Sequence, residues 1–125
     1  MSPQNRPRPT DAELEILNVL WERGPSTVRE VQQNLRREAG YTTVLKLLQI
    51  MTDKGLVVRN ESQRSHVYRA RHKQEHMQRR LVKDLLDRAF AGAADRLVLQ
   101  ALSARNLTRE ELAEIRKLLD DLEGT

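Results

Sequence analysis

Three short amphipathic segments, followed by a change of hydrophobic period, constrain the fold of this chain more than any other feature. Each segment is too short to be a stable helix in isolation, so its apolar face must pack on a neighbour. Two segments open with a capping box, in which a Thr and a Glu three residues later satisfy each other's backbone amides. These pairs are Thr10 with Glu13 and Thr27 with Glu30. The expected helices cover residues 11–23, residues 28–38, and the residues after Thr42 up to Lys54.

The apolar pattern then becomes typical of strands. Residues 56–60 and 66–70 are β-prone runs, and the polar residues 61–65 lie between them. An isolated hairpin is marginally stable, so we expect this one to pack on the three helices. Three helices with tight connections and a following hairpin predict a winged helix-turn-helix domain over residues 10–71. The predicted fold class is α+β and mainly α.

From residue 73 to the end the pattern is again helical. Phe90-Ala91-Gly92 interrupts the first helix, a second is expected around residues 94–104, and Thr108 with Glu111 forms a capping box for a third. The apolar stripes of these helices have no core of their own, which predicts a dimer built by mutual burial over residues 72–125. The candidate dimer residues are Met77, Leu81, Leu85, Leu112, Ile115, Leu119 and Leu122.

The positive charge is concentrated in the N-terminal part of the chain. Residues 1–72 hold 12 Lys and Arg against 8 Asp and Glu, whereas residues 73–125 hold 10 of each. Residues 1–9 have three prolines and no periodic apolar pattern, so we expect a disordered arm in which Arg6 and Arg8 can reach phosphate. A basic half joined to a neutral half fits a DNA-binding domain with an association segment.

Several classes of protein are excluded by composition. The chain has no cysteine, which removes disulfides, thiolate metal sites and cysteine nucleophiles. Its apolar runs are too short to span a membrane, so we expect a cytoplasmic protein. No nucleophile with a base, paired buried carboxylates or glycine-rich phosphate loop is recognisable, so no enzyme and no cofactor are expected. His66, His72 and His76 lack a carboxylate that would complete a metal site, and no metal is expected.

The candidate DNA-binding residues lie at the start of the third helix and at the tip of the hairpin. In a helix-turn-helix the N-terminal end of the second motif helix enters the major groove, where short polar side chains reach base edges. Thr can also contact a thymine methyl, and Lys can reach guanine or the backbone. The alternative for Thr42 is a role only as N-cap. The predicted DNA-binding residues are Tyr41, Thr42, Thr43, Lys46 and Arg64.

Three further arginines on the expected second helix are weaker candidates for phosphate contacts. Such contacts supply affinity without sequence information. Surface arginines are more often solvated than bound to a ligand. The three are Arg29, Arg36 and Arg37.

Several segments together resemble the BlaI/MecI (penicillinase repressor) family of bacterial regulators, whose copper-responsive branch is CopY. They are residues 10–17, Trp21, Tyr41-Thr42-Thr43-Val44, Lys54-Gly55-Leu56 and the hairpin ending in Tyr68. The resemblance covers nearly the whole chain. It implies a homodimeric winged-helix repressor whose third helix reads a pseudo-palindromic operator, and, in antibiotic-sensing members, a membrane sensor protease as a partner that triggers cleavage of the repressor.

This chain departs from the family pattern at three places. The family is cleaved at an Asn-Phe bond, and the matching residues 97–102 lack that pair. The C-terminal cysteine cluster of the copper branch is absent. Lys46 and Ile50 stand where family members often carry Thr and Arg, so the operator sequence of the family is not carried over to this chain.

The residues and the resemblance together predict a sequence-specific, DNA-binding transcriptional repressor that acts as a homodimer. Two alternatives remain open at this point. One is a winged-helix regulator that responds to a small molecule, and the other is a winged-helix module that binds proteins and never DNA.

Overall fold

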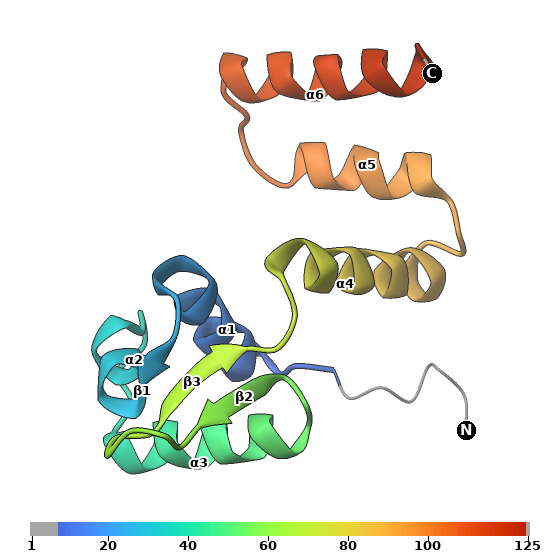
Figure 1. Ribbon diagram of the computed structural model, residues 1–125. Coiled ribbons are helices and arrows are strands. Elements are labelled where there is room, and N and C mark those ends of the chain that lie inside the picture. Colours follow the sequence, from blue (N-terminus) through green and yellow to red (C-terminus); the bar gives the residue numbers. More distant parts are fainter. Residues whose placement is uncertain (1–7, 125) are drawn as a thin grey trace. The chain divides into compact units, whose positions relative to one another are not determined.

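The computed structural model describes residues 8–124. The chain divides into two compact units, and the boundary along the sequence lies between Arg79 and Arg80. Each unit is described by itself. The predicted disordered arm lies almost entirely outside the described residues, and Arg6 is among the residues not described. The described chain is mainly helical and has one small antiparallel sheet, which confirms the predicted fold class (Figure 1).

The first unit contains three helices, a three-stranded sheet and the beginning of a fourth helix (Figure 1). Its sheet has the strand order β1-β3-β2, so the last strand in sequence is the central one. The elements are α1 (Asp11–Arg23), β1 (Ser26–Thr27), α2 (Val28–Asn34), α3 (Tyr41–Asp53), β2 (Val57–Asn60), β3 (Val67–Ala70) and α4 (Gln74–Ala89).

The predicted capping boxes at the starts of α1 and α2 are both confirmed. The backbone amide of Glu13 donates to Oγ1 of Thr10 at 3.2 Å, and the amide of Thr10 donates to Oε1 of Glu13 at 2.8 Å. Thr27 and Glu30 make the same two contacts at the start of α2. These contacts satisfy amides that have no partner within the helix, and so they determine where each helix begins.

The second helix is shorter than predicted. It ends at Asn34, and the next residue, Leu35, has an extended backbone with ψ 142°. Two side-chain amides stabilise this ending: Asn34 donates to the Glu30 carbonyl at 2.7 Å, and Gln32 donates to the Ala39 carbonyl at 3.2 Å. The extension of the helix to residue 38 was therefore wrong: the side chain of Asn34 bonds a carbonyl of the last turn, and the side chain of Gln32 bonds the connecting segment instead.

The sheet contains one strand that the sequence analysis did not anticipate. The two-residue strand β1 pairs with the central strand, with Ser26 opposite Tyr68 and Thr27 opposite Val67. The predicted hairpin is confirmed, with Val57 opposite Ala70 and Asn60 opposite Val67. The side chain of Asn60 accepts a hydrogen bond from the amide of Ser62 at 2.9 Å and so begins the turn that ends β2.

The core of the first unit lies between its helices and its sheet. Tyr68, on the central strand, is fully buried together with apolar side chains from all three helices. The buried apolar residues are Ile16, Leu17, Val19, Leu20, Val28, Val31, Val44, Leu48, Met51, Leu56, Val57, Tyr68 and Met77. Burying these side chains is the main source of stability of this unit.

An ion pair between a buried carboxylate and a partly exposed lysine joins the start of α1 to the end of α3. Glu13 is 2% exposed, and its Oε1 accepts a hydrogen bond from Nζ of Lys54 at 2.6 Å. Nζ of Lys54 also donates to the Arg8 carbonyl at 3.0 Å. Burial alone would raise the pKa of Glu13, but the hydrogen bonds from Lys54 and Thr10 outweigh it, and the pKa is lowered from 4.5.

The second unit continues α4 and adds α5 (Ala94–Ser103) and α6 (Arg109–Glu123). The predicted interruption after α4 is confirmed, since Ala91 and Gly92 have positive φ angles of 49° and 81°. The predicted capping box at the start of α6 is also confirmed, with Thr108 as N-cap and Glu111 as its partner.

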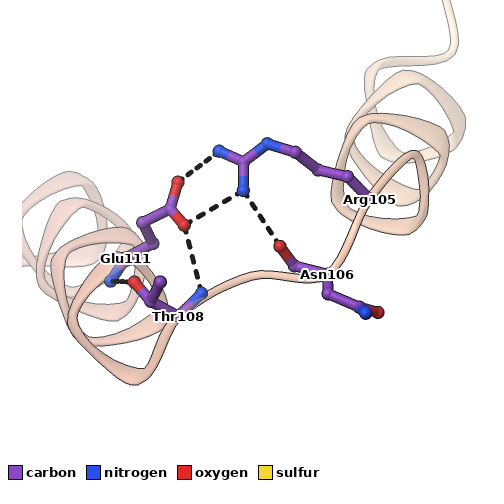
Figure 2. A network of polar contacts seen from close by, with 4 residues as sticks. All are labelled: Arg105, Asn106, Thr108 and Glu111. Atoms are coloured by element: carbon purple, nitrogen blue, oxygen red, sulfur yellow. Dashed lines mark hydrogen bonds and ion pairs between the residues drawn. The ribbon is translucent and has the colours of Figure 1, made fainter.

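Arg105 reinforces the turn between α5 and α6 (Figure 2). Its guanidinium contacts both carboxylate oxygens of Glu111 and also donates to the Asn106 carbonyl at 2.9 Å. The hydrogen bonds from Arg105 and Thr108 lower the pKa of Glu111 to about 2. One carboxylate therefore caps α6 and holds the preceding turn.

Neither α5 nor α6, all of whose residues are described, contains a buried side chain. Leu119 and Leu122 of α6 are 52% and 74% exposed, although both are large and apolar. Met77 is different, since it is 2% exposed and belongs to the core of the single chain. The predicted dimer contact at Met77 does not agree with this burial.

We expect the Lys54→Met variant to be about 2 kcal/mol less stable than the wild type at pH 7, because it leaves the buried Glu13 carboxylate without a hydrogen-bond donor from a partly exposed cation. The matched control is Lys83→Met, which removes an exposed partner of Asp87 and should cost less than about 0.5 kcal/mol. Urea unfolding measures both values. Equal stabilities of the two variants would contradict the importance of the buried pair.

The same pair predicts a pH dependence. The pKa of Glu13 in the folded protein lies below 4.5. The contribution of its ion pair to the free energy of unfolding is therefore fully present above about pH 4.5, and it is lost as the pH falls through this lowered pKa. The stability difference between the wild type and Lys54→Met should therefore narrow in acid.

Candidate nucleic-acid interface

The third helix has one buried face and one exposed face. Val44, Leu48 and Met51 are fully buried in the core. On the opposite side, Thr42, Thr43 and Lys46 are exposed. The core therefore determines the rotation of α3, and three of the four predicted DNA-binding residues on this helix, Thr42, Thr43 and Lys46, share its outward face.

The N-terminal end of α3 has no side-chain cap. Its N-cap is Gly40, which has no side chain, and the first bond within the helix runs from the Val44 amide to the Gly40 carbonyl at 3.1 Å. The interpretation of Thr42 as an N-cap was wrong, because the helix begins at Tyr41, two residues earlier than predicted, with Gly40 as its N-cap. Helix N-terminal amides carry partial positive charge and favour a phosphate oxygen as a partner.

A groove beside this end of α3 brings together two predicted residues that are 23 positions apart in sequence, Tyr41 and Arg64. It runs between the starts of α2 and α3 and the hairpin loop. Two further side chains that can carry positive charge, Arg29 and His66, also line it. The complete lining is Thr27, Val28, Arg29, Tyr41, Leu45, Arg64, Ser65, His66 and Tyr68.

Arg29 stacks on the ring of Tyr41, with its guanidinium carbon 5.8 Å from the ring centroid. This cation–π contact orients the arginine at the edge of the groove while leaving its N–H groups able to bind an anion. Arg29 was a weaker candidate in the sequence analysis, and the pair could not be recognised there because its members lie on different helices.

The other two weaker candidates lie elsewhere. Arg36 and Arg37 follow α2 instead of belonging to it. Nε of Arg37 is 2.8 Å from Oε2 of Glu15 on α1, so its charge is already paired within the chain. Neither residue lines the groove that contains Arg64.

Two residues on the outward face of α3 were absent from the predicted DNA-binding residues. Gln49 and Ile50 are both exposed, one helical turn beyond Lys46. The signal was present in the sequence, because a helix with Val44, Leu48 and Met51 inside must turn positions 46, 49 and 50 outwards.

The histidines near the start of α4 have structural contacts. The carbonyl of His72 accepts a hydrogen bond from Nε1 of Trp21 at 2.9 Å, which joins the end of α1 to the segment that enters α4. The rings of His72 and His76 stack with their centroids 5.0 Å apart.

Residues 8–124 contain no group of three side chains that could hold a metal ion. No helix among these residues is both long and apolar enough to cross a membrane.

The chain matches the family model described as penicillinase repressor over residues 9–121. It is 34% identical over 120 residues to the transcriptional regulator BlaI of Mycobacterium tuberculosis, covering 91% of this chain and 84% of that protein. It is 22% identical over 113 residues to the penicillinase repressor of Staphylococcus aureus, covering 89% and 90% of the two chains.

Among solved structures, the chain is similar to the transcriptional regulator Tm0710 from Thermotoga maritima. The TM-score is 0.48 at 20% sequence identity, and the match covers 92% of this chain and 74% of that one.

We expect Arg64→Ala to weaken binding to every DNA sequence by a similar factor and to flatten the salt dependence, because a phosphate contact carries no sequence information. The slope of log K against log salt should fall by about one for each protomer that contributes the contact. Arg37→Ala is the matched control, since it removes the same charge from a residue already paired with Glu15. Fluorescence anisotropy measures both, and equal slopes for the two variants would contradict a phosphate contact at Arg64.

Proposed function

The chain belongs to the penicillinase repressor family of DNA-binding transcriptional regulators, which are not enzymes, and we propose that it acts as a homodimer on a pseudo-palindromic operator. In this proposal α3 of each protomer reads one half-site. The domain assignment is DNA binding by residues 10–71 and association by residues 72–125. Membership of this family excludes one of the alternatives above, a winged-helix module that binds only proteins.

The observation that carries the proposal is the arrangement of charge and short polar side chains around the start of α3. Thr42, Thr43 and Lys46 face outward from a helix whose other face is buried. Tyr41 and Arg64 line the adjacent groove. This combination is typical of DNA interfaces, where cationic side chains contact phosphates and side chains on a reading helix contact base edges.

The individual roles follow from the chemistry of each residue. The hydroxyl of Thr43 can hydrogen-bond a base edge, and Lys46 can reach guanine or phosphate. Arg64 and Arg29 flank the helix end and can contact the backbone, where they supply affinity and set the position of the helix. Repression then results from occupation of a promoter that the polymerase would otherwise use. A cytoplasmic location follows from this role and is part of the proposal.

The exposed apolar side chains of the second unit support the proposed dimer. A single chain leaves Val98, Leu112, Leu119 and Leu122 exposed. Leu112, Ile115, Leu119 and Leu122 recur at helical spacing on one face of α6, and contact between two copies would remove these side chains from water. Coupling two reading helices raises affinity steeply, because the second half-site is bound at high effective concentration.

We expect Thr43→Ala to lower the preference for the operator over a shuffled duplex by about fivefold to tenfold, since it removes a base contact and leaves phosphate contacts intact. Binding to the shuffled duplex should change little. Anisotropy titrations of both duplexes measure the ratio. If Thr43→Ala weakened both duplexes equally, the assignment of α3 as the reading helix would be wrong.

We expect Leu119→Asp to convert the dimer into monomers, because it places a charge in an apolar contact. The matched control is Ala113→Asp, which introduces the same charge at an exposed position on the opposite face of α6. Sedimentation equilibrium should give the monomer mass for the first variant and the dimer mass for the second. A dimer mass for both would place the association surface elsewhere.

A further inference from the structure

One side chain on the outward face of α3 does not fit its polar surroundings. Ile50 is 40% exposed, although isoleucine is among the residues most often buried. Its neighbours on the same face, Lys46 and Gln49, are polar and exposed as well. The core of the first unit does not account for Ile50, because the inward face of the helix is already formed by Val44, Leu48 and Met51.

The charges around Ile50 indicate what covers it. Lys46 lies one helical turn before it on the same face, and Arg29 and Arg64 line the groove beside the start of the helix. This arrangement complements a polyanion and disfavours a purely apolar partner. DNA offers both features, since its backbone is anionic and its major groove exposes one apolar group, the C5 methyl of thymine.

We propose that Ile50 is a specificity-determining residue that packs against the C5 methyl of a thymine in the major groove. This inference rests on the proposed function, because it places the outward face of α3 in that groove. It deepens the proposal by assigning a preferred base to a residue that makes no hydrogen bond through its side chain.

Helix geometry relates this contact to the one proposed for Thr43. The two residues are seven positions apart, which is close to two full turns, so they lie on the same side of the helix. Their separation along the helix axis is about 10 Å, which spans at most about three base-pair steps at 3.4 Å each. Because a reading helix lies at an angle to the duplex axis in the major groove, the thymine contacted by Ile50 should lie within about three base pairs of the base pair read by Thr43.

The test replaces thymine by deoxyuridine, which lacks only the C5 methyl. An operator is first selected from random-sequence duplexes with the purified full-length protein. Each thymine is then replaced in both half-sites, and affinities are measured by fluorescence anisotropy. For the wild type, one replacement should weaken binding about threefold to fourfold in each half-site, the effect of removing one methyl group from an apolar contact. The combined effect is about tenfold.

The Ile50→Ala variant should bind the methylated and demethylated operators equally at that position and retain the wild-type response at all other thymines. The matched control is Gln49→Ala, an exposed neighbour on the same face whose side chain ends in a polar amide. It should keep the full tenfold response. Because Ile50 is exposed, its substitution should leave thermal unfolding close to that of the wild type, which circular dichroism checks.

Two results would overturn the inference. In one, wild-type binding is not weakened by any deoxyuridine replacement within about three base pairs of the base pair that Thr43 reads. In the other, Ile50→Ala and the wild type respond equally at every replaced thymine. Both leave the proposed function standing, because an operator has still been selected. A selection that enriches no sequence at all would contradict the proposed function itself.

Discussion

The buried Glu13 carboxylate is the interaction on which the arrangement of the first unit depends. It accepts a hydrogen bond from the backbone amide of Thr10, the N-cap of α1, and a second from Nζ of Lys54 just beyond the end of α3. A carboxylate that is 2% exposed requires such partners, since an unpaired buried charge is very costly. Because α1 and α3 are joined at this point, the pair reinforces the rotation of α3 that its buried residues Val44, Leu48 and Met51 determine, and with it the set of side chains that the helix presents outward.

The candidate DNA-binding surface follows from that rotation. With Val44, Leu48 and Met51 in the core, the helix must expose the face that contains Thr43 and Lys46. The hairpin packs through the fully buried Tyr68, so its loop carries Arg64 to the groove beside Tyr41. The candidate interface therefore results from packing that stabilises the domain itself.

Local signals made much of this fold predictable from sequence. The capping boxes at Thr10, Thr27 and Thr108 each marked a helix start correctly, because both partners lie within four residues of each other.

Features that depend on distant partners were not predictable. The strand β1 exists only through pairing with β3, and the early end of α2 depends on a bond from Gln32 to the Ala39 carbonyl. The Arg29–Tyr41 contact joins two helices and was missed for the same reason, whereas Ile50 could have been found from helical periodicity alone.

The central claim is that the outward face of α3, carried by a dimer, recognises a specific DNA sequence. The most direct test is fluorescence anisotropy of the full-length protein with the promoter of its own gene and with a shuffled duplex of equal composition, at low and at near-physiological salt. The account predicts that both duplexes bind at low salt and that only the promoter remains bound tightly at the higher salt, since base contacts are less sensitive to salt than phosphate contacts. Equal affinities for the two duplexes at both salt concentrations would contradict it.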